Sequence, residues 1–407
     1  MSRWYVRPQW AASGVLAMAV SAPAFAQEPP ACADISGGAP ILYGAGGSAQ
    51  TSLVGKVSVV LQNADDPIFA VYKDDAGACA GIDALTGLGA TAISGSAKYW
   101  DSATGTQLTC TLPLGGQALD FASMGNGPLV CPLITDPALV DGIVDVTGPI
   151  SSVNLIVPNA SSQQAISAEG AYLVYGFGPD ADIAPWNNAD PSYYIHRNEN
   201  SFVQIYVSIA TGLPLTRFYG VDAGSNGNSV AYLTALANPE QGVAFVSGDV
   251  ADANRATVRT LAYQHFGQNA GYWPDSSATA FDKINVRRGQ YYLWGPAHLY
   301  GREGATPGSY QDPNVGTLLD YWQGASQPAG TTQTITDTAI LNKNVPTCAM
   351  EATRDGDLGP IYRYAPPEPC GCLFDFSVTG ATTCAVCDDD TPCGGTDVCR
   401  HGFCEEY

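Results

Sequence analysis

The segment Tyr193-Tyr194-Ile195-His196-Arg197-Asn198-Glu199-Asn200-Ser201-Phe202 places an apolar, buried-type strand directly before an arginine. Four residues after Arg197, Ser201 stands at the start of an amphipathic segment, and this pattern predicts a helix that begins there. A guanidinium, a hydroxyl and the free amides of a helix start would then meet at one point, which suits an oxyanion. The glycine-rich turns at 44–48 and 224–228 would add main-chain donors of the same kind.

Strand and helix patterns alternate along most of the chain around this segment. Short apolar runs predict strands, and amphipathic runs that end at Gly or Pro predict helices. The expected strands are 57–62, 67–72, 119–123, 153–157 and 242–248, and the expected helices include 77–88, 228–238, 251–264, 313–322 and 334–343. Alternation of this kind indicates α/β lobes with mainly parallel sheets, in which ligands bind at the carboxyl ends of the strands.

The first 26 residues have the pattern of a cleavable signal peptide. Arg3 and Arg7 precede an apolar stretch, and Ala24-Phe25-Ala26 is a small-x-small cleavage site. The mature chain would begin near Gln27, and because no cysteine stands there, we expect no lipid anchor. No later apolar run is long enough to span a bilayer. The sequence therefore predicts an exported protein, periplasmic or secreted.

The chain is strongly acidic, with a formal net charge of −21. Loss of the leader removes two arginines and no acid, so the mature charge is −23. An acidic surface excludes nucleic acid as a partner, because phosphate backbones require a basic one. It also opposes the attraction of an anion from a distance. A bound anion would have to be held locally, by dipoles and an arginine.

Twelve cysteines in an exported chain predict disulfides. Eight of them lie after residue 347, and the segment from about 370 has too few apolar residues for a core, so it needs covalent cross-links. The bridges Cys110–Cys131 and Cys348 with Cys370 or Cys372 are expected. Zinc binding through Cys384-x2-Cys387 is the less favoured alternative, and the acidic loop 388–390 lacks EF-hand spacing. No metal site is predicted.

Catalytic motifs are weak throughout the sequence. The four histidines are scattered without metal spacing, and no Gly-x-Ser-x-Gly elbow precedes a helix. The acidic pairs Asp65-Asp66 and Asp74-Asp75 stand in hydrophilic turns and are interpreted as solvated faces. We therefore expect no catalytic residues, no cofactor and no enzyme activity.

Several motifs occur in the order found in a known family. They are Asp34-Ile35-Ser36-Gly37-Gly38-Ala39, Leu119-Asp120-Phe121-Ala122-Ser123-Met124-Gly125-Asn126-Gly127-Pro128-Leu129, Trp186-Asn187-Asn188 followed by Arg197–Ser201, Gly224-Ser225-Asn226-Gly227-Asn228-Ser229-Val230, and 242–248. Over roughly residues 34–345 the chain resembles the type II periplasmic binding proteins, specifically the phosphate-binding proteins of ABC importers and their DING relatives.

The resemblance implies two α/β lobes that close on a ligand, with a cysteine-rich tail added. The first lobe is expected from residues 34–130 and 255–345, the second from 131–254, and the tail from 346–407. A small anion or polar solute would bind between the lobes. The expected ligand-binding residues are Gly46, Gly47, Ser48, Ser123, Asn126, Arg197, Asn200, Ser201 and Asn228.

The sequence departs from the family pattern at two places that concern the ligand. Met124-Gly125-Asn126 has no carboxylate where the family has an aspartate, and Phe202 and Val203 follow Ser201 where the family has Gly and Thr. Each site residue also has a simpler interpretation. Arg197 would be a surface arginine paired with Glu199 or Asp190, and Ser201 only a helix cap.

These features favour a monomeric, exported receptor for a small oxyanion, used in uptake or sensing. Its protein partner would be an ABC-transporter permease or a surface partner. The main alternative is a surface interaction protein that keeps this scaffold without a ligand. A secreted hydrolase that uses Ser201 is the weakest alternative.

Overall fold

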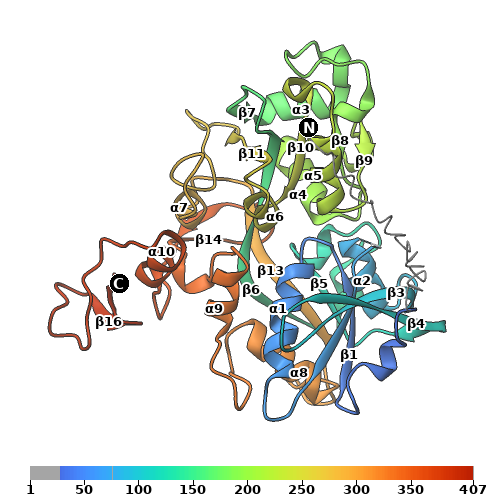
Figure 1. The fold of residues 1–407 in the computed structure, drawn as a ribbon, viewed down its shortest axis with the longest axis vertical. Coiled ribbons are helices and arrows are strands. Elements are labelled where there is room, and N and C mark those ends of the chain that lie inside the picture. The colour runs from blue at the N-terminus through green and yellow to red at the C-terminus, as the bar shows by residue number, and fades with distance from the viewer. Residues whose placement is uncertain (1–27, 76, 407) are drawn as a thin grey trace, which may run out of the picture.

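The computed structural model describes residues 28–75 and 77–406. The expected signal peptide, residues 1–26, lies outside this part of the chain. The ribbon has two lobes, with α1, β1 and α8 in the lower one and α3, α4 and β8 in the upper one (Figure 1). The C-terminal tail projects from one flank, beside α7 and α9. We call the lower part the first lobe and the upper part the second lobe.

A nine-stranded sheet connects the two lobes. Its strands follow the order β10-β6-β13-β5-β1-β2-β3-β4, and β11 pairs with the end of β6 on the edge opposite β10. The strands are β1 (Ile41–Gly46), β2 (Phe69–Lys73), β3 (Ala92–Trp100), β4 (Gln107–Ala118), β5 (Phe121–Met124), β6 (Ile143–Pro158), β10 (Ala244–Ser247), β11 (Val258–Thr260) and β13 (Trp294–Arg302). The expected strands 67–72, 119–123 and 242–248 are thereby confirmed within a few residues, and 153–157 is the last part of the longer strand β6.

Parallel pairing in this sheet is limited to its centre. Among the strands of the described residues, β1 pairs in parallel with β2 and with β5. The β3–β4 hairpin and the returning strands β6 and β13 pair antiparallel with their neighbours. The mixed α/β fold is confirmed, but the expectation that parallel pairs predominate is wrong. Hairpins and strands that return from the other lobe reverse direction, and the apolar patterns do not reveal this.

β6 is the strand that passes from one lobe to the other. Its residues 143–152 pair with β13, and residues 153–158 pair with β10 and β11 of the second lobe. The second half of β6 is buried throughout, so its side chains pack on both faces as in the interior of a sheet. The lobe boundaries expected from the sequence stay a prediction.

Helices cover the sheet of the first lobe. They are α1 (Thr51–Gln62), α2 (Ala78–Thr86), α8 (Pro313–Trp322) and α9 (Ile335–Leu341). The strand expected at 57–62 is wrong, because these residues form the second half of α1. Leu53, Val54, Val57 and Leu61 are all buried, and this spacing places them on one helical face. The valines favour a strand by propensity, and packing overrides that preference.

The second lobe combines short strands and helices around β10 and β6. Its other elements are β7 (Ala165–Ser167), α3 (Ala168–Phe177), β8 (Ile195–His196), α4 (Phe202–Thr211), β9 (Val221–Asp222), α5 (Asn226–Thr234), α6 (Gly248–Ala253) and β12 (Ala262–Gln264). The helix expected at 251–264 is wrong. α6 ends at Ala253, and the chain continues as β11 and β12 because β6 and β7 offer strand edges there. α7 (Ile284–Arg287) then precedes β13.

Two disulfides cross-link the first lobe, one from the N-terminal segment to β4 and one from α2 to the segment after β5. Cys32 bonds Cys110 with a Cα–Cα distance of 4.9 Å, and Cys79 bonds Cys131 at 5.5 Å. The expected bridge between Cys110 and Cys131 is wrong. Ala31 forms a β-bridge with Thr111 of β4, and this contact places the neighbouring residues Cys32 and Cys110 side by side.

The tail contains four further disulfides. They are Cys348–Cys370, which confirms one expected pair, and Cys372–Cys384, Cys387–Cys399 and Cys393–Cys404. The tail elements are β14 (Ala352–Arg354), β15 (Ile361–Arg363), α10 (Gly371–Thr379), β16 (Val398–Arg400) and β17 (Phe403–Glu405). Glu405 is buried and accepts the amides of Cys372 and Leu373 at 2.8 and 3.0 Å. The end of the chain is thereby fixed to the start of α10.

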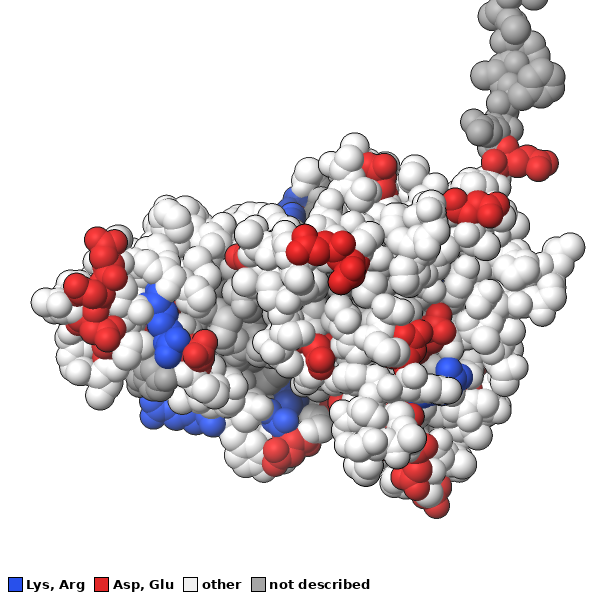
Figure 2. All heavy atoms as spheres, turned by 90° about the horizontal axis from the view of Figure 1, so that it is seen from below, with Lys and Arg blue, Asp and Glu red and all other residues white. Residues whose placement is uncertain are grey.

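The surface of the molecule reflects its acidic composition. Acidic side chains occupy separate groups across the face in Figure 2, with fewer basic side chains among them. Among residues 28–75 and 77–406, no helix has both the length and the apolar character needed to span a bilayer.

Candidate functional site

A cleft of about 990 Å³ is lined by residues of both lobes. The first lobe contributes the turn after β1, the start of α1, the end of β2 and the β3–β4 hairpin. The second lobe contributes the loop 224–228 and the start of α6. The two glycine-rich turns expected to converge therefore both reach the cleft, through Ser48 on one side and 224–228 on the other.

Arg197 links these two walls. Its Nη1 donates to Ser48 Oγ at 3.4 Å and to Asn226 Oδ1 at 3.2 Å, and its Nη2 donates to the Gly224 carbonyl at 2.8 Å. All three partners line the cleft. The side chain follows β8 directly, and its own main-chain N–H donates to Gln204 of α4 at 2.9 Å. The strand β8, the loop 224–228 and the helix α4 thus fix the guanidinium where the two lobes meet.

The Arg197 guanidinium is buried without a neutralising partner. Arg197 is 2% exposed, and in the described part of the chain no carboxylate lies within ion-pair distance of it. Burial lowers its pKa to about 10, and the more distant Asp222 and Asp74 oppose this effect. It therefore stays charged at neutral pH. The alternative interpretation, a surface arginine paired with Glu199 or Asp190, does not fit this environment, and Asp190 instead accepts the Ser192 amide.

Gly46 and Gly47 shape the turn that carries Ser48. A Cβ at Gly46 would lie 2.0 Å from the Ser123 carbonyl oxygen, so only glycine allows β1 to end beside β5. The Gly47 carbonyl accepts the Tyr72 hydroxyl at 3.2 Å. These glycines position Ser48 and do not themselves line the cleft.

Ser123 and Asn126 are buried and do not line the cleft. Ser123 is fully buried, and its hydroxyl is 2.7 Å from that of Tyr72, whose pKa is raised by burial. Asn126 is also fully buried, and neither atom of its side-chain amide has a hydrogen-bond partner among the described residues. Phe202 packs directly against Gly125 and fills the adjoining space.

Asn200 and Ser201 form a main-chain contact between the lobes at the start of α4. The Asn200 carbonyl accepts the amides of Ala78 and Cys79 at 2.8 and 3.3 Å. These are the first two amides of α2, so that helix start is already occupied. Ser201 precedes α4 as its cap residue, but its hydroxyl makes no capping hydrogen bond.

The loop 224–228 contributes a different asparagine from the one expected. Asn228 is exposed, lines the cleft, and donates from its side chain to the Ala223 carbonyl at 2.9 Å. Asn226 is 1% exposed, accepts from Arg197, and donates to Ser247 Oγ at 3.0 Å. Ser225 caps α5, which places Asn226 at the first helical position and turns it inward.

Acidic residues in the cleft were missed by the sequence analysis. The interpretation of Asp74 as solvated is wrong, because it is 9% exposed, accepts Thr51 Oγ1 at 2.5 Å and pairs with Lys98. Asp249 at the start of α6 is 7% exposed, and burial raises its pKa to about 6. For Asp74 a signal was present, since it follows a buried strand and carboxyl ends of strands form binding sites.

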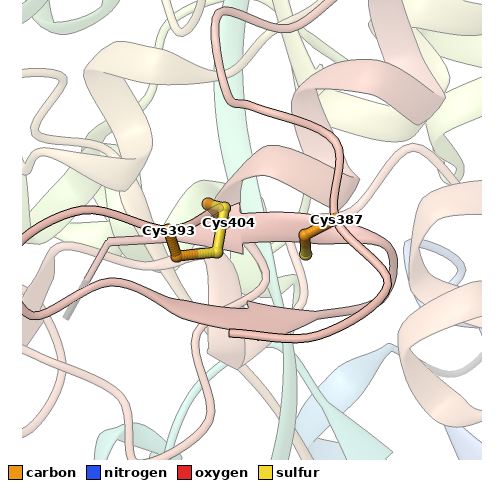
Figure 3. A group of neighbouring side chains, drawn as sticks. All are labelled: Cys387, Cys393 and Cys404. Atoms are coloured by element: carbon orange, nitrogen blue, oxygen red, sulfur yellow. A yellow bond between two sulfur atoms is a disulfide. The ribbon is translucent and has the colours of Figure 1, made fainter. Parts of the chain in front are cut away.

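The cysteine cluster of the tail offers no thiolate. The sulfurs of Cys387, Cys393 and Cys404 lie within 4.8 Å of one another. Figure 3 shows Cys393 and Cys404 joined by a disulfide, with Cys387 beside them. Cys387 is bonded to Cys399, so all three sulfurs are already in covalent bonds. This supports the preference for disulfides over a zinc site.

No family model matches the sequence, and no curated protein matches it. Solved structures do match. A phosphate ABC transporter substrate-binding protein of Clostridium perfringens, solved with bound phosphate, has a TM-score of 0.52 at 11% identity, covering 75% of this chain and 99% of that one. A phosphate transport receptor of Vibrio cholerae has a TM-score of 0.44 at 12% identity, with coverages of 75% and 99%. The chain therefore has the two-lobed type II periplasmic-binding-protein fold, extended by a disulfide-rich C-terminal segment.

Proposed function

We propose that this chain is an exported solute-binding protein that holds a small oxyanion between its lobes for uptake or sensing. The observation that supports this most is Arg197, a buried and unneutralised cation whose partners Ser48, Gly224 and Asn226 all line the cleft. A buried charge without a counter-ion is costly, and a bound anion would remove that cost.

In this proposal the anion replaces neutral oxygens as the hydrogen-bond acceptor of Arg197. An oxyanion that enters the cleft accepts from the guanidinium in place of Ser48 Oγ and Asn226 Oδ1. Charge-assisted hydrogen bonds of this kind are stronger than those to neutral oxygens. The Ser48 hydroxyl, released from Arg197, is then able to donate to the anion as well. Closure of the lobes around the anion completes the site.

The first test is Arg197→Ala, measured by isothermal titration calorimetry with inorganic phosphate. We expect binding to weaken by about 2–4 kcal/mol, or roughly 30- to 800-fold in Kd, the range for loss of one partner of a buried charge pair. Arg259→Ala is the matched control, since Arg259 lies in the same lobe, bonds the Asn159 carbonyl and lies outside the cleft. Equal affinity in the native protein and Arg197→Ala would remove this arginine from the site.

A surface interaction protein without a ligand is the second candidate. It is favoured by the Asn200 carbonyl, which already occupies the first amides of α2, and by the two bonded nitrogens of Arg197. A melting-temperature screen with phosphate, sulfate and small carboxylates separates the two candidates. A receptor is stabilised by its ligand through mass action, whereas a scaffold without a site melts at the same temperature in every solution.

A further inference from the structure

A cation and an anion stand at opposite ends of one polar chain on the second-lobe wall of the cleft. Arg197 donates to Asn226 Oδ1 at 3.2 Å, and Asn226 Nδ2 donates to Ser247 Oγ at 3.0 Å. The Ser247 side chain is in turn close enough to the carboxyl of Asp249 to lower the pKa of that group. Arg197 and Asp249 therefore lie at the two ends of a row of polar side chains that passes through Asn226 and Ser247.

Asp249 lacks the partner that its burial calls for. It is 7% exposed and lines the cleft, and its Oδ1 has no hydrogen-bond partner among residues 28–75 and 77–406. Most buried polar atoms in proteins are hydrogen-bonded, and an ionised carboxylate oxygen can only accept. A cleft-lining carboxylate that keeps an unpaired oxygen thus indicates a donor on the ligand.

The first-lobe wall carries charges of both signs as well. Asp74 pairs with Lys98, and Asp75 pairs with Lys73 at 2.9 Å. Lys56 also lines the cleft, is half-buried, and has no hydrogen bond or ion pair within the described residues. Three carboxylates line a cleft whose cations are Lys56, Lys98 and the adjoining Arg197. A bare anion near Arg197 would also experience repulsion from these carboxylates.

The volume of the cleft also favours an organic ligand over an inorganic anion. At about 990 Å³ it lies at the upper end of the range of roughly 300–1,000 Å³ that is typical of pockets for organic ligands. An inorganic oxyanion would leave most of this space to water, and Asp249 would keep its unpaired oxygen.

We propose that the natural solute is a small zwitterion, whose oxyanion group pairs with Arg197 and whose protonated amine pairs with the Asp249 carboxylate. This inference rests on the proposed function, because it uses the same cleft and the same arginine. It adds the chemical class of the solute, an amine-bearing phosphonate, phosphate ester or carboxylate. It also assigns a ligand-binding role to Asp249, at the opposite end of the polar chain from Arg197.

The experiment compares matched ligands that differ only in the amine. Calorimetric titrations at neutral pH use inorganic phosphate, the aminoalkylphosphonates with one to three carbons, and the alkylphosphonates of the same lengths. We expect at least one aminoalkylphosphonate to bind at least about 10-fold more tightly than its amine-free counterpart, as one hydrogen bond between charged groups provides. Asp249→Asn should reduce this preference to about 2-fold or less, and it should not weaken the amine-free ligand, because the variant removes one of the carboxylates that repel a bare anion.

A control variant separates a lost contact from a damaged fold. Asp180→Asn neutralises an exposed carboxylate of the same lobe and should keep the full preference for the amine. Melting curves of both variants check that they are folded. If no aminoalkylphosphonate binds more tightly than its counterpart, or if the preference survives in Asp249→Asn, the inference is wrong while anion binding stands. If neither phosphate nor any phosphonate binds, the proposed function itself fails.

Discussion

The buried position of Asp249 disfavours the ionised form of its carboxyl group. Burial raises its pKa from an ordinary 3.8 to about 6, while the hydrogen bonds from Ser247 and from the Val250 main chain lower it. A carboxyl whose pKa is higher in the folded than in the unfolded protein binds its proton more tightly when folded. The contribution of this carboxyl to folding stability is therefore most favourable below about pH 4 and decreases as the pH rises toward 6.

Asp249→Asn should accordingly stabilise the ligand-free protein at pH 7. The shift of about two pKa units corresponds to about 1–3 kcal/mol, and the gain should vanish below about pH 4, where the native carboxyl is protonated in both states. Urea unfolding at the two pH values measures it, with Asp180→Asn as the control that changes little. An Asp249→Asn variant as stable as the native protein at pH 7 would contradict this assignment. Residues that serve binding often reduce stability in this way.

At the level of single residues, the expectation that Arg197 and Ser48 meet agrees with the structure, but their other neighbours were not expected. Arg197 was recognisable because a charge that directly follows a buried strand is unusual. Asn226 was not, because an Asn-Gly-Asn turn does not reveal which amide points inward. Asp74 owes its burial to Thr51 and Lys98, which are 23 and 24 residues away, and no local pattern contains that contact.

At the scale of elements, a buried group of four charges fixes α6 to the segment before α7. Lys283 Nζ lies 2.7 Å from Asp252 and 2.8 Å from Asp275, and Arg255 contacts the same two carboxylates at 2.6 Å. Burial raises the pKa of Asp275, and the nearby cations Lys283 and Arg255 counteract this. The two carboxylates depend on both cations for their charge balance.

Lys283→Met should therefore destabilise the protein by about 3–5 kcal/mol, since it leaves buried carboxylates without one of their partners. Lys343→Met is a close control, because Lys343 is exposed and has the same left-handed backbone, with φ of 63° against 48° at Lys283. Guanidinium unfolding should show little change for the control. A similarly small effect at Lys283 would show that Arg255 alone suffices for the two carboxylates.

Element types were predictable where packing agreed with propensity. α8 and α9 were predicted from their amphipathic patterns, and α2 and α5 within a few residues. The second half of α1 was not, since its valines favour strands. Residues 254–264 were not either, because β11 and β12 exist only where β6 and β7 provide edges for them. Such edges come from distant parts of the chain.

At the scale of the whole molecule, the tail joins the two lobes away from the cleft. Asp357 accepts the Gly127 amide of the first lobe at 2.9 Å and the Tyr206 hydroxyl of α4 at 3.0 Å. The same segment places Arg354 over the ring of Trp294 at the start of β13, 4.1 Å from its centroid. The tail thus adds a third contact between the lobes, besides the strands that cross between them and the contacts of Arg197 and Asn200.

Asp357→Ala should lower stability by about 1–3 kcal/mol, because it leaves a main-chain amide and a buried tyrosine hydroxyl without their acceptor. Asp355→Ala, two residues away and exposed, is the control. Thermal unfolding at neutral pH compares them with the native protein. Identical melting of all three would mean that this contact makes no net contribution to stability.

The two-lobed architecture was predictable from the order of several weak motifs between residues 34 and 345, not from composition. The disulfide pairing was not, apart from Cys348–Cys370. Which cysteines meet depends on where the N-terminal segment and α2 pack, and spacing along the chain does not contain that information.

All twelve cysteines are bonded, and the last four bridges hold a segment with little apolar core. This has a practical consequence for producing the protein. Thiols stay reduced in the cytoplasm of ordinary expression hosts, so protein made there will carry an unformed C-terminal end. Material for any measurement should come from an export pathway or an oxidising host strain, and a thiol titration near zero should precede every assay.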